Sequence, residues 1–538
     1  MRNVLTRCLG LDEIVEKYRA ISPAEFFYKY REIAGFANPA RAFYQAIREL
    51  VENALDATDA HGIFPDIKIS IRRVDEVQEF YKITVEDNGI GIPPDIVPHA
   101  FGKVLFSSKY VLKQTRGMYG LGVKMVVLYG QLTTGRPVEI VTSKEGYRRI
   151  YYFKLRIDIN KNEPVIIERG SWRKSREWHG TIVTVTIEGD WSRAKSRILE
   201  YLHRTAIVTP YANIVAYTPE NEVVYYPRII DKLPSPPREV RPHPHGVDIE
   251  MLKQLRDLHE FKDIKEMLIR GFQSIGESTA LALLREAEIE PSKSPRAISD
   301  DELLRLINVM KSFTGFRSPS HISISPLGPE IITAGLKRMF NPEFVHAVSR
   351  KPQSYSGHSF AVEAGVAYGG KTPLSEDDKP LILRYANKIP LLYDESSDVT
   401  TFVVKEDINW ENYGISFPAP IAILVHVCST KVPFKGVGKE SIADVPEIRR
   451  EIKLALMDIL RALKTYIGKR MKEEEIKRKA EAISKYIPEV VRSLAKMLSG
   501  NDQMEKTLME KLVVIVSNKT GIPVSEIQRI VSTVEIGF

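Results

Sequence analysis

The stretch Glu49-Leu-Val-Glu-Asn53-Ala-Leu-Asp56-Ala57 lies within a helical pattern that runs from about Pro39 through His61. Glu49 and Asn53 are four residues apart, so a helix carries both side chains on one face, one turn from each other. A carboxylate beside an amide oxygen suits metal-assisted phosphate chemistry. The amide oxygen completes a magnesium shell without adding charge, and the carboxylate accepts a proton from an attacking water. Alone, this motif is equally typical of an exposed polar helix face.

A second element follows a strand pattern and reads Val85-Glu86-Asp87-Asn88-Gly89-Ile90-Gly91-Ile92. Its two glycines, spaced by two, allow a sharp turn and a close approach to a ligand. Asp87 stands at the strand end, where it can accept a hydrogen bond from an exocyclic amine such as that of adenine. An ordinary Asn-Gly hairpin turn explains the same letters, and the element by itself favours that alternative.

A glycine-rich loop then opens an apolar helix at Val123 to Tyr129, and it reads Arg116-Gly117-Met118-Tyr119-Gly120-Leu121-Gly122-Val123-Lys124. Such a loop presents backbone N–H groups and the partial positive charge of a helix to phosphate. From Lys103 to Lys124 there are five basic residues and no acidic residue, which favours a phosphate neighbour. Farther along, His179-Gly180-Thr181 begins another strand, where Thr181 offers a hydroxyl group.

The pattern around these elements predicts an α/β unit over residues 1–235, with a mostly antiparallel sheet and helices on one face. Period-two runs predict strands at Ile67–Val74, Tyr81–Glu86, Val138–Thr142, Arg149–Ile157 and Thr181–Ile187. A proline-rich stretch, Pro234 to Pro244, ends this unit. A second unit is expected over residues 236–316, and within it Val247 to Phe313 are helical by pattern.

A third unit, over residues 317–487, is expected to hold strands and turns and to end in a long helix from about Val445 to Tyr486. We expect Pro488 to interrupt that helix. Charge on nearly every residue from Lys469 to Arg478 predicts a solvated stalk. Residues 488–538 form a short helical tail.

Together and in this order, the four elements resemble the GHKL ATPase superfamily. The resemblance implies a Bergerat-type ATP fold with ATP and Mg²⁺ as cofactors. By position, Glu49 is similar to the general base, Asn53 to the magnesium ligand and Asp87 to the adenine reader. The stretch from Gly117 to Lys124 resembles the phosphate-binding lid. The remaining nucleotide-binding positions that the resemblance implies are Ser108, Lys109 and Thr181.

A competing stretch, Gly365-Val-Ala-Tyr-Gly-Gly370-Lys371-Thr372, matches the P-loop pattern letter for letter. A P-loop works because a helix begins at its Lys-Thr and aims backbone amides at phosphate. Here Pro373 follows at once, and an acidic turn containing Glu376, Asp377 and Asp378 comes next. We therefore interpret the match as chance and expect no nucleotide there.

The rest of the chain resembles the B subunits of type IIB DNA topoisomerases (topoisomerase VI). Phe272-Gln-Ser-Ile275-Gly276-Glu-Ser-Thr-Ala280 resembles their helix–two-turns–helix insert, in which Ser278 can cap the following helix. Cys428-Ser-Thr-Lys431-Val-Pro-Phe-Lys435-Gly-Val-Gly-Lys439 resembles the loop of their transducer domain. The switch lysine that reaches the γ-phosphate matches Lys439, while spacing alone leaves Lys431 and Lys435 open. Trp410-Glu411-Asn412-Tyr413 matches a Trp-Lys-x-Tyr pattern of the family except at Glu411, so any electrostatic role of that lysine is in doubt.

This family resemblance implies an ATP-hydrolysing subunit that dimerises on ATP, with a strap formed by the first ~20 residues across the partner copy. It closes a gate on duplex DNA and drives strand passage through a break made by the DNA-cleaving A subunit of topoisomerase VI, in an A₂B₂ heterotetramer that relaxes or decatenates DNA. Two alternatives stay open: a MutL-type mismatch-repair ATPase, and a nucleotide-dependent clamp without turnover.

The amino-acid composition excludes some classes of protein but does not indicate a function. The 538 residues are 43% hydrophobic and 27% charged, which is ordinary for a soluble chain of several domains. Cys8 and Cys428 cannot build a disulfide framework, which predicts a reducing, cytoplasmic compartment. The longest apolar stretch, Pro418 to Cys428, is shorter than the ~20 residues of a membrane span, so we expect no membrane contact. A net charge of +8 permits a polyanionic partner without demanding one.

Overall fold

The computed structural model describes residues 20–75, 77–117, 120–258, 260–375, 379–498 and 501–535. The expected N-terminal strap, and the lid residues Met118 and Tyr119, lie outside these ranges. The described residues divide into two compact units: those up to Ile408 together with Phe417–Ile459, and Asn409–Ser416 together with those from Leu460 onward. The domain boundaries expected after residues 235, 316 and 487 stay predictions.

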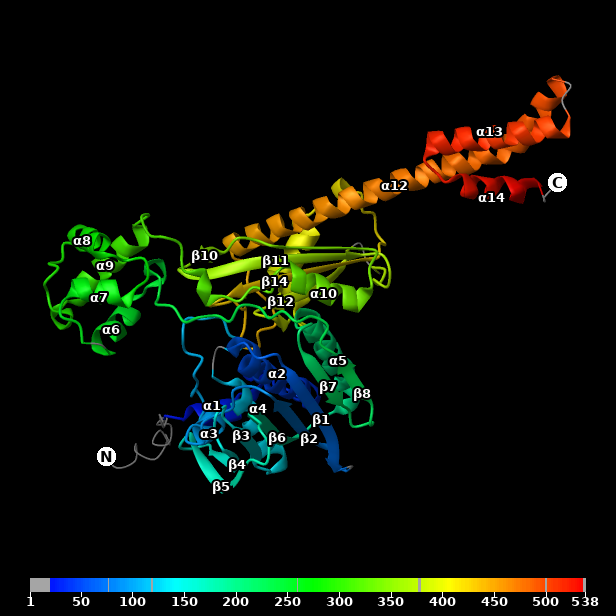
Figure 1. The fold of residues 1–538 in the computed structure, drawn as a ribbon. Coiled ribbons are helices and arrows are strands. Elements are labelled where there is room, and N and C mark those ends of the chain that lie inside the picture. The colour runs from blue at the N-terminus through cyan, green and yellow to red at the C-terminus, as the bar shows by residue number, and fades with distance from the viewer. Residues whose placement is uncertain are drawn as a thin grey trace, which may run out of the picture. The chain divides into compact units, whose positions relative to one another are not determined.

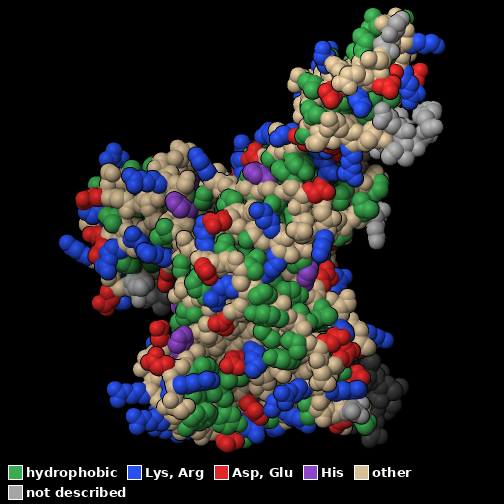
Figure 2. Space-filling view, turned by 45° about the vertical axis from the view of Figure 1, so that its right-hand side comes forward, with side chains coloured by type: hydrophobic (Ala, Val, Ile, Leu, Met, Phe, Trp, Pro, Cys, Tyr) green, Lys and Arg blue, Asp and Glu red, His purple; other side chains and the backbone are tan. Residues whose placement is uncertain are grey.

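No helix within the described ranges is long and apolar enough to pass through a membrane. Figure 2 shows basic and acidic side chains intermixed over the visible face, which agrees with a net charge of only +8. Long-range charge therefore does not single out one surface in this view.

An eight-stranded sheet organises the N-terminal part of the first unit, in the order β5-β4-β3-β6-β2-β1-β7-β8 (Figure 1). Neighbouring strands are antiparallel except for the parallel pair β1 and β7. The strands are β1 Asp66–Asp75, β2 Phe80–Asp87, β3 Val138–Ser143, β4 Arg149–Asp158, β5 Glu163–Arg173, β6 Gly180–Glu188, β7 Asn213–Tyr217 and β8 Val223–Tyr226. The five predicted strands are confirmed, and β5, β7 and β8 are additional.

Helices cover one face of this sheet, as the sequence predicted. They are α1 Pro23–Lys29, α2 Pro39–Thr58, α3 Val97–Gly102, α4 Gly122–Thr134 and α5 Trp191–Val208. Both α2 and α4 pack against β6 and against each other. Helix α2 begins where the Asn38 side chain accepts a hydrogen bond from the Arg41 backbone N–H, with Pro39 in the first turn. The predicted arrangement, a mostly antiparallel sheet with helices on one face, is confirmed.

The next segment is helical and has an apolar core of its own. It contains α6 Ile249–Leu258, α7 Ile264–Gly271, α8 Glu277–Glu286 and α9 Asp300–Ser312. Gly276 is the residue that caps the start of α8, with no side-chain hydrogen bond. Ser278 lies inside α8, so the expected serine cap is wrong: the helix begins one residue before Ser278, immediately after the glycine turn.

A second sheet follows, with six strands in the order β10-β11-β14-β12-β13 and with β9 paired to β11. The strands are β9 Phe344–Ser349, β10 Gln353–Tyr355, β11 His358–Tyr368, β12 Leu381–Ala386, β13 Ile389–Pro390 and β14 Ile421–Ser429. Helix α10, Pro329–Phe340, packs on β9 and β11 and also on α5 of the first sheet. Gly335 allows this last contact, because a Cβ there would overlap the Ile207 carbonyl oxygen. Helix α11, Val399–Phe402, is short.

The long C-terminal helix is α12, Pro446–Met497, and it runs through Pro488 instead of ending there. Proline removes one backbone hydrogen bond, but the flanking Ile487 and Val491 belong to an apolar cluster with α13, Asp502–Thr520, and α14, Val524–Glu535. Packing therefore outweighs the lost hydrogen bond, and Figure 1 shows α13 and α14 beside the end of α12. Residues 469–478 are all exposed, as predicted for the charged stretch.

Candidate active site

A cavity of about 580 Å³ opens between α2, the ends of β2 and β6, and the start of α4. It brings together most of the side chains that the sequence singled out. The predicted residues that line it are Glu49, Asn53, Asp87, Ser108, Lys109, Gly117, Gly120, Leu121, Gly122, Val123, Lys124, Thr181 and Lys439. All the predicted site residues except Met118 and Tyr119, which are outside the described ranges, therefore meet at one place.

Helix α2 presents Glu49 and Asn53 to the cavity from consecutive turns. The Gln45 side-chain amide donates to Glu49 Oε1 at 2.8 Å, which fixes the carboxylate. Asn53 donates its Nδ2 to the Glu49 backbone carbonyl at 2.9 Å. Because the amide nitrogen is held this way, Asn53 Oδ1 is oriented as an acceptor, and Lys109 Nζ donates to it at 3.0 Å. Glu49 is only 7% exposed.

Asp87 ends strand β2, and its side chain is buried at the edge of the cavity. Its Oδ1 accepts from the backbone N–H groups of Gly89 at 2.8 Å and Thr181 at 3.2 Å. Burial raises the pKa of the Asp87 carboxyl to about 7, against the lowering effect of those two hydrogen bonds. Asp87 Oδ2 has no partner among the described residues, so it can accept from a ligand.

The glycines after Asp87 serve close packing. Gly91 has φ +69°, and a Cβ there would overlap the Ser143 carbonyl oxygen. This turn is therefore a close approach between two backbones and not a free hairpin loop.

The lid ends where α4 begins, and Gly122 is the first residue of that helix. A Cβ on Gly122 would overlap Glu49 Oε2, so only glycine lets the helix start beside that carboxylate. No side chain caps this N-terminus, and its first N–H groups are available to an anion. Lys124 Nζ donates to the Phe106 carbonyl at 2.8 Å. Burial, followed by the nearby charge of Lys109, lowers the pKa of Lys124 to about 8.

Lys439 reaches the same cavity from the segment after β14. Its Nζ donates to the Arg116 carbonyl at 3.0 Å and lies 3.5 Å from Glu52 Oε2. Lys439 is 5% exposed, whereas Lys431 and Lys435 are exposed and do not line the cavity. Of the three lysines that spacing left open, the structure places Lys439 at the site.

Sequence reasoning did not assign roles to Asp56 and Arg116, although both stand inside the quoted stretches. Arg116 donates to Asp56 Oδ1 at 3.0 Å, and Lys109 Nζ lies 2.6 Å from Asp56 Oδ2. Arg116 also forms a bidentate pair with Asp59. The three-residue step from Asn53 to Asp56 on α2 was the available signal, because it keeps Asp56 on the same face.

The P-loop-like stretch is not such a site. Gly365 to Tyr368 belong to β11, and Gly369 and Gly370 turn with φ +73° and +61°. The Thr372 N–H then donates to the Gly369 carbonyl, and no helix follows among the described residues before β12. The helix that a P-loop requires is thus missing from the described residues, as the sequence predicted, and the absence of nucleotide binding there stays a prediction.

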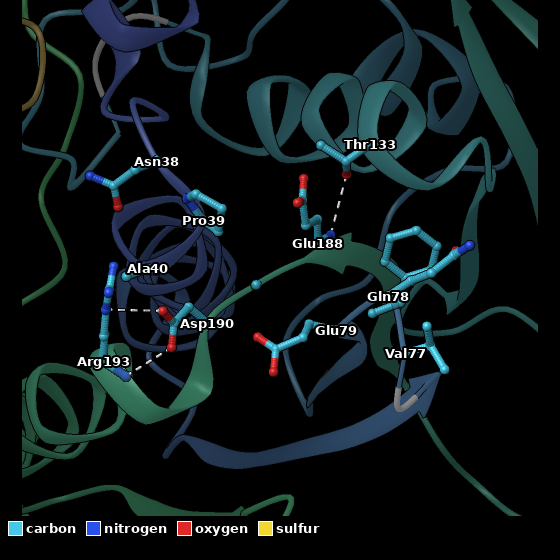
Figure 3. A pocket seen from close by; sticks show the side chains of 12 residues that line it. Asn38, Pro39, Ala40, Val77, Gln78, Glu79, Thr133, Glu188, Asp190 and Arg193 are labelled. Carbon is cyan, nitrogen blue, oxygen red and sulfur yellow. Dashed lines mark hydrogen bonds and ion pairs between the residues drawn. The ribbon is translucent and has the colours of Figure 1, made fainter.

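A second, more open hollow of about 920 Å³ lies near the start of α2 and the end of β6 (Figure 3). Glu79, Glu188 and Asp190 line it together with Arg193, which pairs with Asp190. None of the predicted nucleotide-binding residues reaches this hollow. Its acidic lining is the opposite of what a triphosphate needs.

Among the described residues, Glu363, His426 and Cys428 form the one three-membered group with metal-ligand side chains. The Glu363 carboxylate already accepts from the N–H groups of Leu327 and Gly328 and from Ser349. His426 Nδ1 lies 2.8 Å from Glu363 Oε2. Burial would raise the pKa of Glu363, but the hydrogen bond and charge of His426 lower it below its ordinary value. The group is a satisfied hydrogen-bond network and not a metal centre.

Comparison with known proteins agrees with this geometry. Residues 38–189 match the family described as histidine kinase-, DNA gyrase B- and HSP90-like ATPase, and residues 319–479 match the topoisomerase VI B subunit transducer. The chain is 54% identical over 511 residues to the B subunit of type 2 DNA topoisomerase 6 from Sulfurisphaera tokodaii, covering 94% of this chain and 96% of that one. The corresponding protein of Saccharolobus islandicus strain L.S.2.15 is 53% identical with the same coverage.

Among solved structures, the ATPase region of Saccharomyces cerevisiae topoisomerase II aligns at 13% identity with a TM-score of 0.40, covering 85% of this chain and 99% of that one. The family assignment rests on the sequence relatives.

Proposed function

This chain belongs to the B subunits of type 2 DNA topoisomerase 6, and from that membership we propose how its residues bind and hydrolyse ATP. It is the ATP-dependent subunit of a type II DNA topoisomerase, with a GHKL ATPase domain and a transducer domain. The relatives thereby decide between the two families that the sequence left open, and the MutL-type alternative is set aside.

The observation that carries the proposal is the meeting of Glu49, Asn53 and the start of α4 at one cavity. Glu49 acts as the general base. Gln45 holds its Oε1, so its Oε2 faces Gly122 at the uncapped helix N-terminus, where a phosphate is favoured. A water between Oε2 and that phosphate gives up its proton to Oε2 as it attacks.

Asn53 is proposed as the magnesium ligand, and the residues fit that ion. Asn53 Oδ1 already accepts a hydrogen bond from a cationic group, Lys109 Nζ. The Asn53 Nδ2 donates to the Glu49 backbone carbonyl, so the oxygen is the atom that is left for a metal ion. An amide oxygen near carboxylates, in a cavity open to phosphates, suits the few protein ligands that Mg²⁺ takes. Bound there, the ion would offset the negative charge that develops on the phosphates.

The remaining groups orient the nucleotide. Asp87 Oδ2 accepts from the adenine amine, with Thr181 beside it. The N–H groups from Gly120 to Lys124, together with the Lys124 and Lys439 ammonium groups, face the phosphates. Such preorganised donors supply most of the catalysis in phosphoryl transfer. Ser108 and Lys109 complete this side of the cavity.

We further propose the partners that family membership implies. They are duplex DNA, a DNA-cleaving A subunit and a second copy of this chain, in an A₂B₂ assembly located in the cytoplasm. ATP-dependent closure of the two copies on one duplex would then drive strand passage through the break made by the A subunit.

The magnesium role is tested with Asn53→Ala, and the matched control is Asn308→Ala, an exposed asparagine on α9. We expect Asn53→Ala to lose the magnesium dependence of ATP binding, measured by calorimetry with and without Mg²⁺, while the control keeps it. Equal magnesium dependence in both variants would remove Asn53 as the ligand.

Relaxation of supercoiled plasmid tests the assembly. We expect it to require both ATP and the A subunit. Phosphate release in the presence of DNA decides against a clamp without turnover, which would bind ATP and release none.

A further inference from the structure

The turn between β12 and β13 places Asn387 and Lys388 in the left-handed backbone region, with φ +48° and +67°. Two-residue hairpins with positive φ at both positions favour Asn-Gly, so a lysine at the second position is strained. Both side chains are buried, at 2% and 5% exposed. Strain of this kind persists where the surroundings enforce it, and it points to a task for the residue.

The buried end of Lys388 lies against the ATPase domain. Its Nζ donates to Ser325 Oγ at 3.0 Å and lies 3.4 Å from Asp59 Oδ2, just past the end of α2. The backbone of Lys388 is fixed as well, because its N–H donates to His426 Nε2 at 2.9 Å and His426 is held by Glu363. The transducer sheet therefore presents one rigidly held ammonium group to Asp59.

The residues that lead into the lid are bonded to the same hairpin and to the segment before α10. Asn387 Nδ2 donates to the Thr115 carbonyl at 3.1 Å. Gln114 is held on both sides, since its N–H donates to the Ser323 carbonyl at 2.7 Å and its Oε1 accepts from the Ser325 N–H at 2.6 Å. Gln114 and Thr115, at the base of the lid, are thus fixed by transducer residues that do not line the nucleotide cavity. The next residue differs, because the Arg116 carbonyl accepts from Lys439, which does line the cavity.

An alternating series of charges connects the two places: Lys388, Asp59, Arg116, Asp56 and Lys109. Arg116 Nη2 lies 3.0 Å from Asp59 Oδ2, and Arg116 Nη1 lies 3.0 Å from Asp56 Oδ1. At the far end, Lys109 bonds both Asp56 and Asn53 Oδ1. Asp59 and Arg116 are buried, and the Asp56 side chain is 12% exposed. Because a buried charge must keep a partner of opposite charge, a change at one end alters the pairing along the series.

We propose that Lys388 is a positioning residue for the ATP lid, holding Arg116 through Asp59 so that nucleotide occupancy and the β12–β13 hairpin depend on each other. A metal-bound nucleotide at Asn53 competes with Lys109 for Oδ1. When Lys109 leaves, Asp56 relies on Arg116 alone, and Asp59 then relies more on Lys388. This connection differs from that of Lys439, which itself faces the phosphates. It rests on the proposed nucleotide site.

A double-mutant cycle between Lys388→Met and Lys109→Met tests this, using the full chain, Mg²⁺ and a non-hydrolysable ATP analogue in calorimetry. Lys388 does not line the cavity, yet its loss should weaken binding about tenfold, the scale of one charged hydrogen bond. We expect the combined effect to differ from the product of the single effects by at least about fivefold. Agreement with the product to within about twofold, the usual limit of additivity, would overturn the proposal.

Two controls separate coupling from general damage. Lys388→Arg keeps the charge and should restore binding to within about threefold of the wild type. Tyr211→Phe removes the hydrogen bond that the uncharged Tyr211 hydroxyl donates to Asp59 Oδ2 at 2.9 Å and keeps all the charges of the series, so its effect should simply multiply with that of Lys109→Met. If Lys388→Met does not fold, Asp59→Asn replaces it in the cycle with the same expectation. A wild type that binds no ATP would instead contradict the proposed function itself.

Discussion

Two glycine-rich stretches of this chain, residues 117–124 and 365–372, differ in the structure that comes directly after each. The first leads into α4, whose N-terminus has no side-chain cap. The second lies at the end of β11 and turns back without a helix in the described residues before β12. The second stretch nevertheless matches the P-loop sequence motif at every position. In the proposed site the free N–H groups of a helix start would therefore supply the phosphate affinity, and the glycine spacing would be secondary.

The surroundings of the two stretches differ in charge as well. Around the first, Lys109, Lys124 and Lys439 line the cavity. Beside the second, Lys371 is exposed and Gly369 lies against the Glu343 side chain. The cavity at the first stretch also holds the Glu49 carboxylate, but three lysines and the free N–H groups at the start of α4 lie around it. The first stretch is therefore better suited to a triphosphate than the second.

The strongest test of this difference removes one functional group at each of the two glycine-rich stretches. We expect Glu49→Ala to lower ATP turnover by about 10²–10⁴-fold, the contribution typical of a general base, while nucleotide binding remains. Lys371→Ala should leave turnover within about twofold, because an exposed surface substitution changes little. Steady-state phosphate release on both variants measures this.

The reverse pattern would show that the wrong stretch was chosen. A Lys371→Ala variant that stops hydrolysis would place the phosphates at the second stretch. Normal hydrolysis by Glu49→Ala would remove Glu49 as the base.

A second comparison is drawn among the lysines after β14. Lys439→Met should lower kcat by about 10²–10³-fold, as for loss of one preorganised donor to the transition state. Lys431→Met and Lys435→Met should change kcat by less than about threefold, because both side chains are exposed away from the cavity. If either of these variants lost more activity than Lys439→Met, the switch lysine would have to be reassigned.

Paired glycine substitutions separate a steric effect at the site from one on the fold. Gly122→Ala puts a methyl group onto Glu49 Oε2, which is the far end of a flexible side chain and has to move aside from its place in the cavity. We expect ATP affinity to fall about tenfold or more, with little change in the urea midpoint of the nucleotide-free chain. Gly370→Ala, at φ +61° and against the Asn341 carbonyl, should lower that midpoint and leave ATP affinity unchanged. An ATP-binding defect in Gly370→Ala would contradict the comparison.

The sequence allowed the nucleotide site to be predicted because its signals are local. Glu49 and Asn53 share one helix face, and Asp87 follows a strand, so each could be placed without knowing the fold. Asp59 and Arg116 belong to the ATPase part, and Lys388 belongs to a hairpin of the second sheet. The hydrophobic periodicity of one segment cannot predict a contact between residues that are so far apart in the sequence.

Other misses have the same kind of cause. Strand β5 is an exposed edge with Pro164 and Gly170 and without clean alternation, so its pattern was not recognisable. Pro488 stays helical only because α13 and α14 pack beside it.

The smallest expected effect concerns pH, and it separates the adenine end of the cavity from its phosphate end. Burial raises the pKa of Asp87 to about 7, far above its ordinary 3.8. Below that value the free protein holds Asp87 neutral, and a neutral acid is a weaker acceptor for the adenine amine. ATP affinity should therefore rise between pH 6 and pH 8, by at most about tenfold per pH unit.

The contribution of Asp87 to the stability of the nucleotide-free chain should change in the opposite direction. At this carboxyl the folded state binds more protons than the unfolded state between about pH 4 and pH 7, so its contribution to the free energy of unfolding falls as pH rises through that window. Calorimetry at three pH values and urea unfolding measure the two slopes. Asp87→Asn cannot ionise, so it separates the titration of Asp87 from that of the phosphates and of Lys124. In this variant the contribution of Asp87 should disappear from the pH dependence of ATP affinity and from that of the free energy of unfolding. Slopes identical to those of the wild type would show that the adenine amine is bound by another group.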